Sequence, residues 1–199
     1  MADKGNRSGC CSCGSGCCGS SVELPQIKKK SIAIDFLYLD LSVCTRCQGT
    51  DQRLAEALAE VSQVLEATGA EVVVSKINVT SEDLALEHKF VSSPTIRVNG
   101  HDIQMEVKES LCESCGDLCG EDVDCRVWVY QDREYTVPPK AMIIEAILKE
   151  VFGRRDDHAV EKPYVLPENL KRFYSARREQ GDRRDTTCCP APGSGTRCC

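Results

Sequence analysis

Hydrophobic residues between positions 30 and 153 alternate between strand-like and helix-like spacing. Residues 31–39 (SIAIDFLYL) form an almost continuously apolar run, which is typical of a strand covered on both faces. From residue 44 to 67 the spacing becomes helical, and Gly69 is a natural end for this helix. The apolar positions of this helix are Leu54, Leu58, Val61 and Leu65. Residues 70–79 return to a strand pattern, so the chain is predicted to begin with a β-α-β unit.

A shorter helix and a hairpin are expected next. Thr80 or Ser81 can cap a short helix that carries Leu84 and Leu86. Residues 95–98 form a short strand, and Asn99-Gly100 is a strong turn signal leading into a partner strand at 101–104.

Two more helices and a second hairpin follow a cysteine-bearing insertion. Residues 126–130 and 134–137 resemble the arms of a hairpin around Gln131-Asp132. Pro138-Pro139 then opens a helix whose inner face carries Met142, Ile143, Ile147 and Val151. A last amphipathic helix is expected over 167–179. The predicted order is β-α-β-α-β-β-α with insertions.

Composition narrows the class of protein. The 199 residues are 41% hydrophobic and 28% charged, with a net charge of -6, so no basic surface for nucleic acid or an anionic membrane is expected. No apolar run approaches the roughly 20 residues that span a bilayer. The first residues lack the apolar core of a secretory signal, so we expect a cytoplasmic protein. In that compartment cysteines are more often catalytic or metal-binding than structural disulfides.

The 15 cysteines divide the chain into regions. We expect a disordered cysteine-rich arm at 1–25 and a disordered tail at 186–199, because both are too poor in apolar residues to offset ordering entropy. One domain covers 26–155, with a cysteine-rich insertion at about 106–125. A linker at 156–185 carries the last helix.

Cys44 and Cys47 form a C-T-R-C motif between the first strand and the first helix. Unpaired N–H groups and the positive end of the helix dipole favour the thiolate of Cys44, and Arg46 adds a neighbouring cation that would lower its pKa. Cys47 lies one helical turn later and can attack a mixed disulfide on Cys44. This pattern predicts thiol–disulfide exchange or capture of a soft metal, with an inert or zinc-binding pair as the alternative.

The motifs C-T-R-C-x-x-T, V-S-S-P-T-I-R-V-N-G and V-D-C-R-V-W-x-Y…P-P-K-A-M-I-I-E-A-I-L carry a family resemblance. Over residues 30–153 the chain resembles the thioredoxin/glutaredoxin superfamily. More narrowly, it is similar to a bacterial family of thioredoxin-like proteins of uncharacterised function. The resemblance implies an α/β three-layer sandwich, in which a central mixed sheet is flanked by helices. It also implies a cis Ser93–Pro94 bond beside the C-x-x-C motif, where these two residues position a substrate backbone.

The chain departs from thioredoxin at several positions. Val43 precedes the thiol pair where thioredoxin has tryptophan, and Thr45-Arg46 replaces Gly-Pro. Asp35 stands nine residues before Cys44, so the role of the buried acid of thioredoxin does not transfer to it. No residues that grip glutathione are recognisable.

The insertion adds a second group of thiols, spaced C-x2-C-x3-C-x5-C. A tetrahedral zinc site, a disulfide relay and unpaired thiols are three open interpretations of this group, which comprises Cys112, Cys115, Cys119 and Cys125.

The two tails carry vicinal cysteines, which rarely bridge each other but can share a soft ion such as Cu(I), Hg(II) or As(III). Low-complexity sequence without a ligand is the alternative. The residues concerned are Cys10, Cys11, Cys13, Cys17, Cys18, Cys188, Cys189, Cys198 and Cys199.

These patterns predict a thiol–disulfide oxidoreductase linked to stress or to thiophilic-metal handling. Its partners would be protein thiols or a reductase, and the thiol pair would need no cofactor. The alternative is a non-enzymatic protein that binds or delivers arsenite, mercury, copper or zinc. A scaffold role for the domain is a third class.

Overall fold

The computed structural model describes residues 30–120, 122–153 and 163–186. The cysteines of both tails therefore lie outside the described residues, as do residues 156–162 of the predicted linker. The last helix, α5, spans Glu168–Thr186 and so extends beyond the predicted end at 179. No helix in the described part of the chain is long and apolar enough to cross a membrane.

A four-stranded mixed sheet forms the centre of the protein, with the strand order β2-β1-β3-β4. The first two strands are parallel and are joined by α1 (Thr45–Ala67), while β3 and β4 run antiparallel to their neighbours. The strands are Lys30–Tyr38 (β1), Ala70–Asn78 (β2), Thr95–Val98 (β3) and His101–Asp102 (β4). These elements agree with the predicted β-α-β-α-β-β order, with α2 at Glu82–Glu87 capped by the Ser81 side chain.

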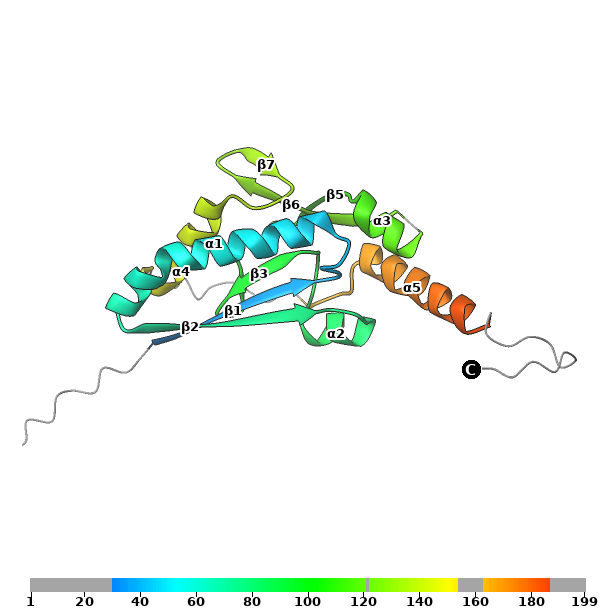
Figure 1. Ribbon diagram of the computed structural model, residues 1–199, viewed down its shortest axis with the longest axis horizontal. Helices are drawn as coiled ribbons and strands as arrows, with labels where there is room; N and C mark the ends of the chain where they lie inside the picture. The colour runs from blue at the N-terminus through cyan, green and yellow to red at the C-terminus, as the bar shows by residue number, and fades with distance from the viewer. Residues whose placement is uncertain (1–29, 121, 154–162, 187–199) are drawn as a thin grey trace, which may run out of the picture.

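Helices cover the two faces of this sheet unequally (Figure 1). On one face, α1 and α4 (Lys140–Phe152) bury a continuous core that includes Ile32, Ile34 and Phe36 of β1. On the other face, α2 and α5 pack only over the C-terminal end of β1. The neighbouring Ala33 and Val73 on that face are exposed. Among the described residues, the run at 31–39 is thus covered on both faces only in its second half, and the second helical layer is partial.

The insertion between β4 and α4 builds a sheet of its own, with the strand order β5-β6-β7. It is longer than the predicted 106–125, because the hairpin of β6 and β7 belongs to the same sheet. Its elements are β5 (Lys108–Leu111), α3 (Glu113–Cys119), β6 (Asp124–Tyr130) and β7 (Arg133–Tyr135). Figure 1 shows β5 and α3 beside the end of α1 at which that helix begins.

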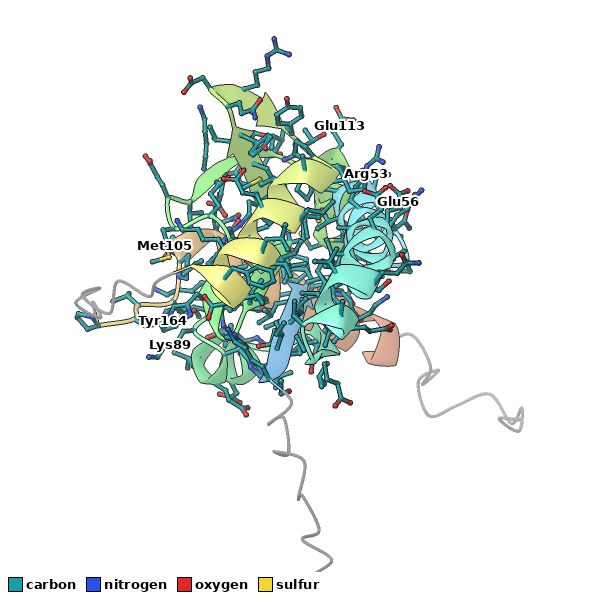
Figure 2. The ribbon with its side chains drawn as sticks, turned by 90° about the vertical axis from the view of Figure 1, so that its left-hand side faces the viewer. Arg53, Glu56, Lys89, Met105, Glu113 and Tyr164 are labelled. Carbon is teal, nitrogen blue, oxygen red and sulfur yellow. The ribbon has the colours of Figure 1, made fainter. Side chains whose placement is uncertain are left out.

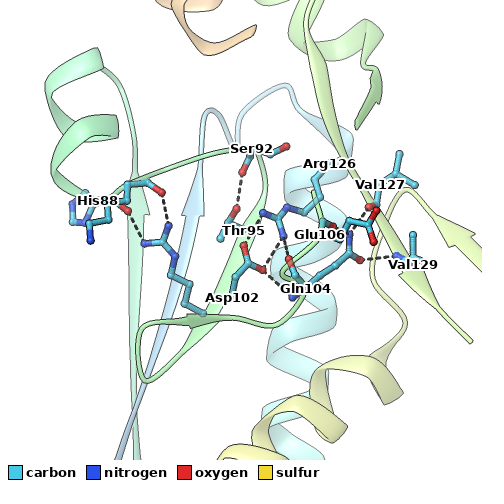
Figure 3. Close-up of polar contacts among 11 residues, drawn as sticks. His88, Ser92, Thr95, Asp102, Gln104, Glu106, Arg126, Val127 and Val129 are labelled. Atoms are coloured by element: carbon cyan, nitrogen blue, oxygen red, sulfur yellow. Dashed lines mark hydrogen bonds and ion pairs between the residues drawn. The ribbon is translucent and has the colours of Figure 1, made fainter. Parts of the chain in front are cut away.

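A buried polar network attaches the insertion to the central sheet (Figure 3). Arg126 of β6 is fully buried, and both of its terminal nitrogens donate to the carboxylate of Asp102 in β4, at 2.8 and 2.7 Å. The guanidinium also lies over the ring of Trp128, 5.1 Å from its centroid. Gln104 bridges to β6 by accepting from the N–H of Val129 and donating to the carbonyl of Val127. The insertion is therefore held in place by hydrogen bonds rather than by an apolar interface alone.

Candidate metal centre

Four cysteine sulfurs from two distant parts of the chain meet in the interior. Cys44 is the N-cap of α1, Cys112 is the N-cap of α3, Cys115 lies in the first turn of α3, and Cys125 lies in β6. Their Sγ atoms all lie within 4.8 Å of one another. The residues are 0%, 3%, 0% and 0% exposed, respectively. We call this group the four-cysteine site.

The local structure of the insertion brings three of these thiols together. Antiparallel pairing of β5 and β6 places Ser110 opposite Cys125, and the N–H of Cys112 donates to the carbonyl of Val123 at 2.8 Å. Because α3 begins immediately after Cys112, Cys115 follows within one helical turn. The Sγ atoms of Cys115 and Cys125 are 3.3 Å apart.

Arg46 fastens the beginning of α1 to this group. Its guanidinium donates to the carbonyl oxygens of Ser110, Leu111 and Cys125 at 3.3, 2.6 and 3.1 Å. Three bonds from one planar fork hold the insertion against α1, two residues after Cys44. The contacts of Arg46 are thus with insertion carbonyls, and its proposed effect on the pKa of Cys44 stays a prediction.

The four thiols divide their protons unequally. Hydrogen bonds from Cys112, Cys115 and Cys125 hold the pKa of Cys44 well below its usual range. Hydrogen bonds from Cys115 and Cys125 lower the pKa of Cys112 to about 7. The pKa values of Cys115 and Cys125 are raised, first of all because each hydrogen-bonds to Cys112. One thiolate is thus stabilised at the expense of two protonated neighbours, and a cation among the sulfurs would let all four ionise.

The spacing suits a tetrahedral thiophilic ion. With Zn–S bonds of about 2.3 Å, tetrahedral geometry separates sulfurs by about 3.8 Å, which agrees with a group confined within 4.8 Å. A site with four protein thiolates is closed, which is typical of sites that hold zinc without reacting.

This ligand set differs from the one expected from the insertion motif alone. Cys112, Cys115 and Cys125 are in the group, but Cys44 occupies the fourth position, which the motif had assigned to Cys119. Cys119 is buried one turn further along α3, and its thiol donates to the carbonyl of Cys115 at 3.5 Å. Sequence spacing could not reveal that Cys44 replaces Cys119 in the ligand set, because Cys44 lies 68 positions before Cys112.

Cys47, Ser93 and Pro94 lie beside the four-cysteine site. The Ser93–Pro94 peptide bond is cis, as the resemblance implied. The Oγ of Ser93 accepts from the N–H of Leu39 at 3.1 Å and lies 3.3 Å from the Sγ of Cys47. The N–H of Cys47 points to the Sγ of Cys44 at 3.4 Å. A hydrogen bond with Cys44 and burial raise the pKa of Cys47.

None of the six described cysteines forms a disulfide. Neither predicted disulfide system, the C-x-x-C pair or a relay in the insertion, is therefore formed in the described residues. The thiol Cys44 is shared between the two groups that the sequence separated, the C-x-x-C pair and the insertion.

The fold and the site define an α/β protein that combines a mixed central sheet with a buried four-cysteine site. The chain belongs to the family described as "Domain of unknown function (DUF2703)", which matches residues 32–147 and therefore includes all four cysteines. It is also similar to an uncharacterised protein of Archaeoglobus fulgidus, with 29% identity over 98 residues. That alignment covers 48% of this chain and 69% of the archaeal protein. No solved structure gives a significant match.

Proposed function

We propose that this protein binds a thiophilic metal ion, Zn²⁺ in the first instance, through Cys44, Cys112, Cys115 and Cys125. The single observation that carries the proposal is the convergence of four buried sulfurs within 4.8 Å. If more than one of these buried thiols ionises, the negative charges repel one another in the interior, which is energetically unfavourable. A divalent cation bound among the sulfurs neutralises this charge. Cu(I), Cd(II) and Hg(II) are also thiophilic and suit the same ligands.

We further propose that the scaffold is thioredoxin-like. The β1-α1-β2-α2-β3-β4 order supports this assignment, as do the parallel pairing of β1 with β2 and the antiparallel pairing of β3 with β1 and of β4 with β3. The cis Ser93–Pro94 bond beside Cys47 also supports the assignment. In this scheme the insertion adapts the thiol at the beginning of the first helix to metal binding, by surrounding it with three further thiols.

A metal inventory with matched variants tests the site. The chain would be purified anaerobically in two forms, wild type and a background in which the nine cysteines outside the described residues are serine. We expect one Zn²⁺ per chain in that background, and a Co²⁺ derivative with the visible spectrum of tetrahedral tetrathiolate coordination. Cys44→Ser and Cys125→Ser should each weaken Zn²⁺ binding by at least about tenfold.

Cys119→Ser is the matched control, because Cys119 is a buried thiol of α3, the helix that carries Cys115, but does not belong to the four-cysteine site. We expect it to retain the ion and the Co²⁺ spectrum. Equal losses in Cys119→Ser and Cys44→Ser, or a Co²⁺ spectrum without thiolate ligation, would contradict the proposal.

Thiol–disulfide exchange between Cys44 and Cys47 is the second candidate, favoured by the N–H of Cys47 pointing to the sulfur of Cys44 at the beginning of α1. Both residues are 0% exposed, so a protein substrate would reach Cys44 only after the insertion moves. Titration in a glutathione redox buffer tests this function. A reversible Cys44–Cys47 disulfide that persists with Zn²⁺ bound would favour exchange over metal binding.

A further inference from the structure

A surface hollow opens beside the four-cysteine site. It has a volume of about 630 Å³ and is lined by residues of α3 together with Leu111, Cys112, Gly120 and Asp122. Three acidic residues line it, Glu113, Asp117 and Asp122, and all three are exposed. Figure 2 shows Glu113 at the surface of the molecule. We call this surface hollow the acidic hollow.

The acidic hollow reaches one of the proposed ligands. Cys112 forms part of its lining, although this residue is only 3% exposed and its sulfur lies within 4.8 Å of the other three. Gly116 and Gly120 also line the hollow, and neither adds a side chain that would fill it. The hollow therefore lies against the residue that forms one side of the four-cysteine site.

The three carboxylates of the hollow have no ion-pair partner among the described residues. No side-chain hydrogen bond or ion pair joins the carboxylates of Glu113, Asp117 or Asp122 to another described residue. The carboxylate of Glu56, in contrast, pairs with the neighbouring Arg53. Three carboxylates around a concave surface create a negative potential that concentrates cations and raises their rate of association.

We propose that the acidic hollow is the access port through which a hydrated divalent cation reaches the four-cysteine site. This inference rests on the proposed function and adds the chemical form of the ion. The carboxylates attract an aqua cation and repel anionic complexes of the same metal. The ion exchanges water for the thiolate of Cys112 first and then for the deeper sulfurs, and the thiol protons leave to the buffer.

Stopped-flow mixing with Cd²⁺ tests the port, because thiolate-to-cadmium charge-transfer absorbance reports ligation directly. The background is the full chain with serine at the nine cysteines outside the described residues. The test variant combines Glu113→Gln, Asp117→Asn and Asp122→Asn. The control removes the same charge outside the insertion, with Glu66→Gln in α1, Glu71→Gln in β2 and Glu87→Gln in α2.

At low ionic strength we expect the test variant to bind Cd²⁺ at least about threefold more slowly, with the same final stoichiometry, and the control to match the parent. The difference should vanish near 1 M salt, where the screening length is about 3 Å. With Cd²⁺ supplied as its anionic nitrilotriacetate complex, the test variant should bind no more slowly than the parent.

Equal rates in the test variant and the parent would overturn the port, and so would equal slowing in the test and control variants. Equal slowing with the aqua ion and the anionic complex would also overturn it, because electrostatic attraction acts on the two sources with opposite sign. If the parent itself shows no thiolate-to-cadmium absorbance, the proposed function fails instead. The two failures are therefore distinguishable.

Discussion

Cys44 takes part in two arrangements at once. As the N-cap of α1 it accepts the N–H of Cys47, which is the geometry of a reactive thiol at the beginning of a helix. It also lies among Cys112, Cys115 and Cys125, which supply the hydrogen bonds that lower its pKa. Its complete burial favours the second arrangement, because an ion is small enough to reach a site that a protein disulfide cannot.

Metal affinity should rise with pH, and the pKa values of the four thiols should determine how steeply it rises. In the free protein Cys44 is ionised, Cys112 titrates near pH 7, and the raised pKa values keep Cys115 and Cys125 protonated. Binding needs four thiolates, so each proton still held must leave. We expect Zn²⁺ to release about two protons at pH 8 and about three below pH 6.

Calorimetric titration in buffers of different ionisation enthalpy measures this proton release. The apparent affinity should fall by at least about 100-fold for each pH unit below neutrality. An enthalpy independent of the buffer would show that the thiols are already ionised and would refute this distribution of protons.

At the scale of elements, β4 is only two residues long, yet it anchors the insertion. His101–Asp102 pairs with β3, and Asp102 also binds the buried guanidinium of Arg126 in β6. The N–H of Arg126 donates to the carbonyl of Ser93 at 2.7 Å. One residue of β6 thus joins the insertion to the strand β4 and to the loop that holds Pro94.

Removal of the Asp102 carboxylate should destabilise this connection strongly. Asp102→Asn leaves Arg126 buried without its counterion, so we expect the free energy of unfolding to fall by about 3–5 kcal/mol. Urea unfolding followed by circular dichroism at a fixed free Zn²⁺ concentration measures the change.

The exposed ion pair between Lys108 and Glu134 provides the control, since it also joins two strands of the insertion. Glu134→Gln should cost less than about 1 kcal/mol. Combining Asp102→Asn with Arg126→Met should restore part of the loss, because the unpaired buried charge is gone. Equal effects of Asp102→Asn and Glu134→Gln would contradict the buried role.

The whole molecule contains two hydrophobic cores that depend differently on the thiols. The core between the sheet and helices α1 and α4 contains no cysteine among its buried residues. The other core contains all six described cysteines together with Leu170, Phe173 and Tyr174 of α5. Bound metal should therefore stabilise the second core and leave the first nearly unaffected.

Chelation of the metal should loosen α3 and α5 before the central sheet. We expect faster amide hydrogen exchange over residues 112–120 and 168–176 on adding a chelator, with β1 and the second half of α1 protected as before. Mass spectrometry of peptides locates the change. Cys44→Ser should show the faster exchange without a chelator and no further change with one. Uniform loss of protection across both cores would contradict the expectation that bound metal stabilises only the core that contains the cysteines.

The sequence by itself determined the elements of the central sheet. Residues 31–39, 70–79 and 95–98 carry local strand signals, and Asn99-Gly100 carries a turn signal, so their backbone preferences act within a few residues. The helical spacing at 44–67 and the motif C-T-R-C likewise placed Cys44 at the beginning of α1 correctly.

Only the tertiary structure decided which thiols meet. The insertion motif contains four cysteines at spacings that suit zinc, but α3 directs Cys119 to the carbonyl of Cys115, and Arg46 brings α1 to the insertion instead. Local sequence governs spacing along one element, whereas a metal site depends on distances between elements. Cys44 and Cys112 become neighbours through the packing of the insertion on the beginning of α1, a contact that no local pattern encodes.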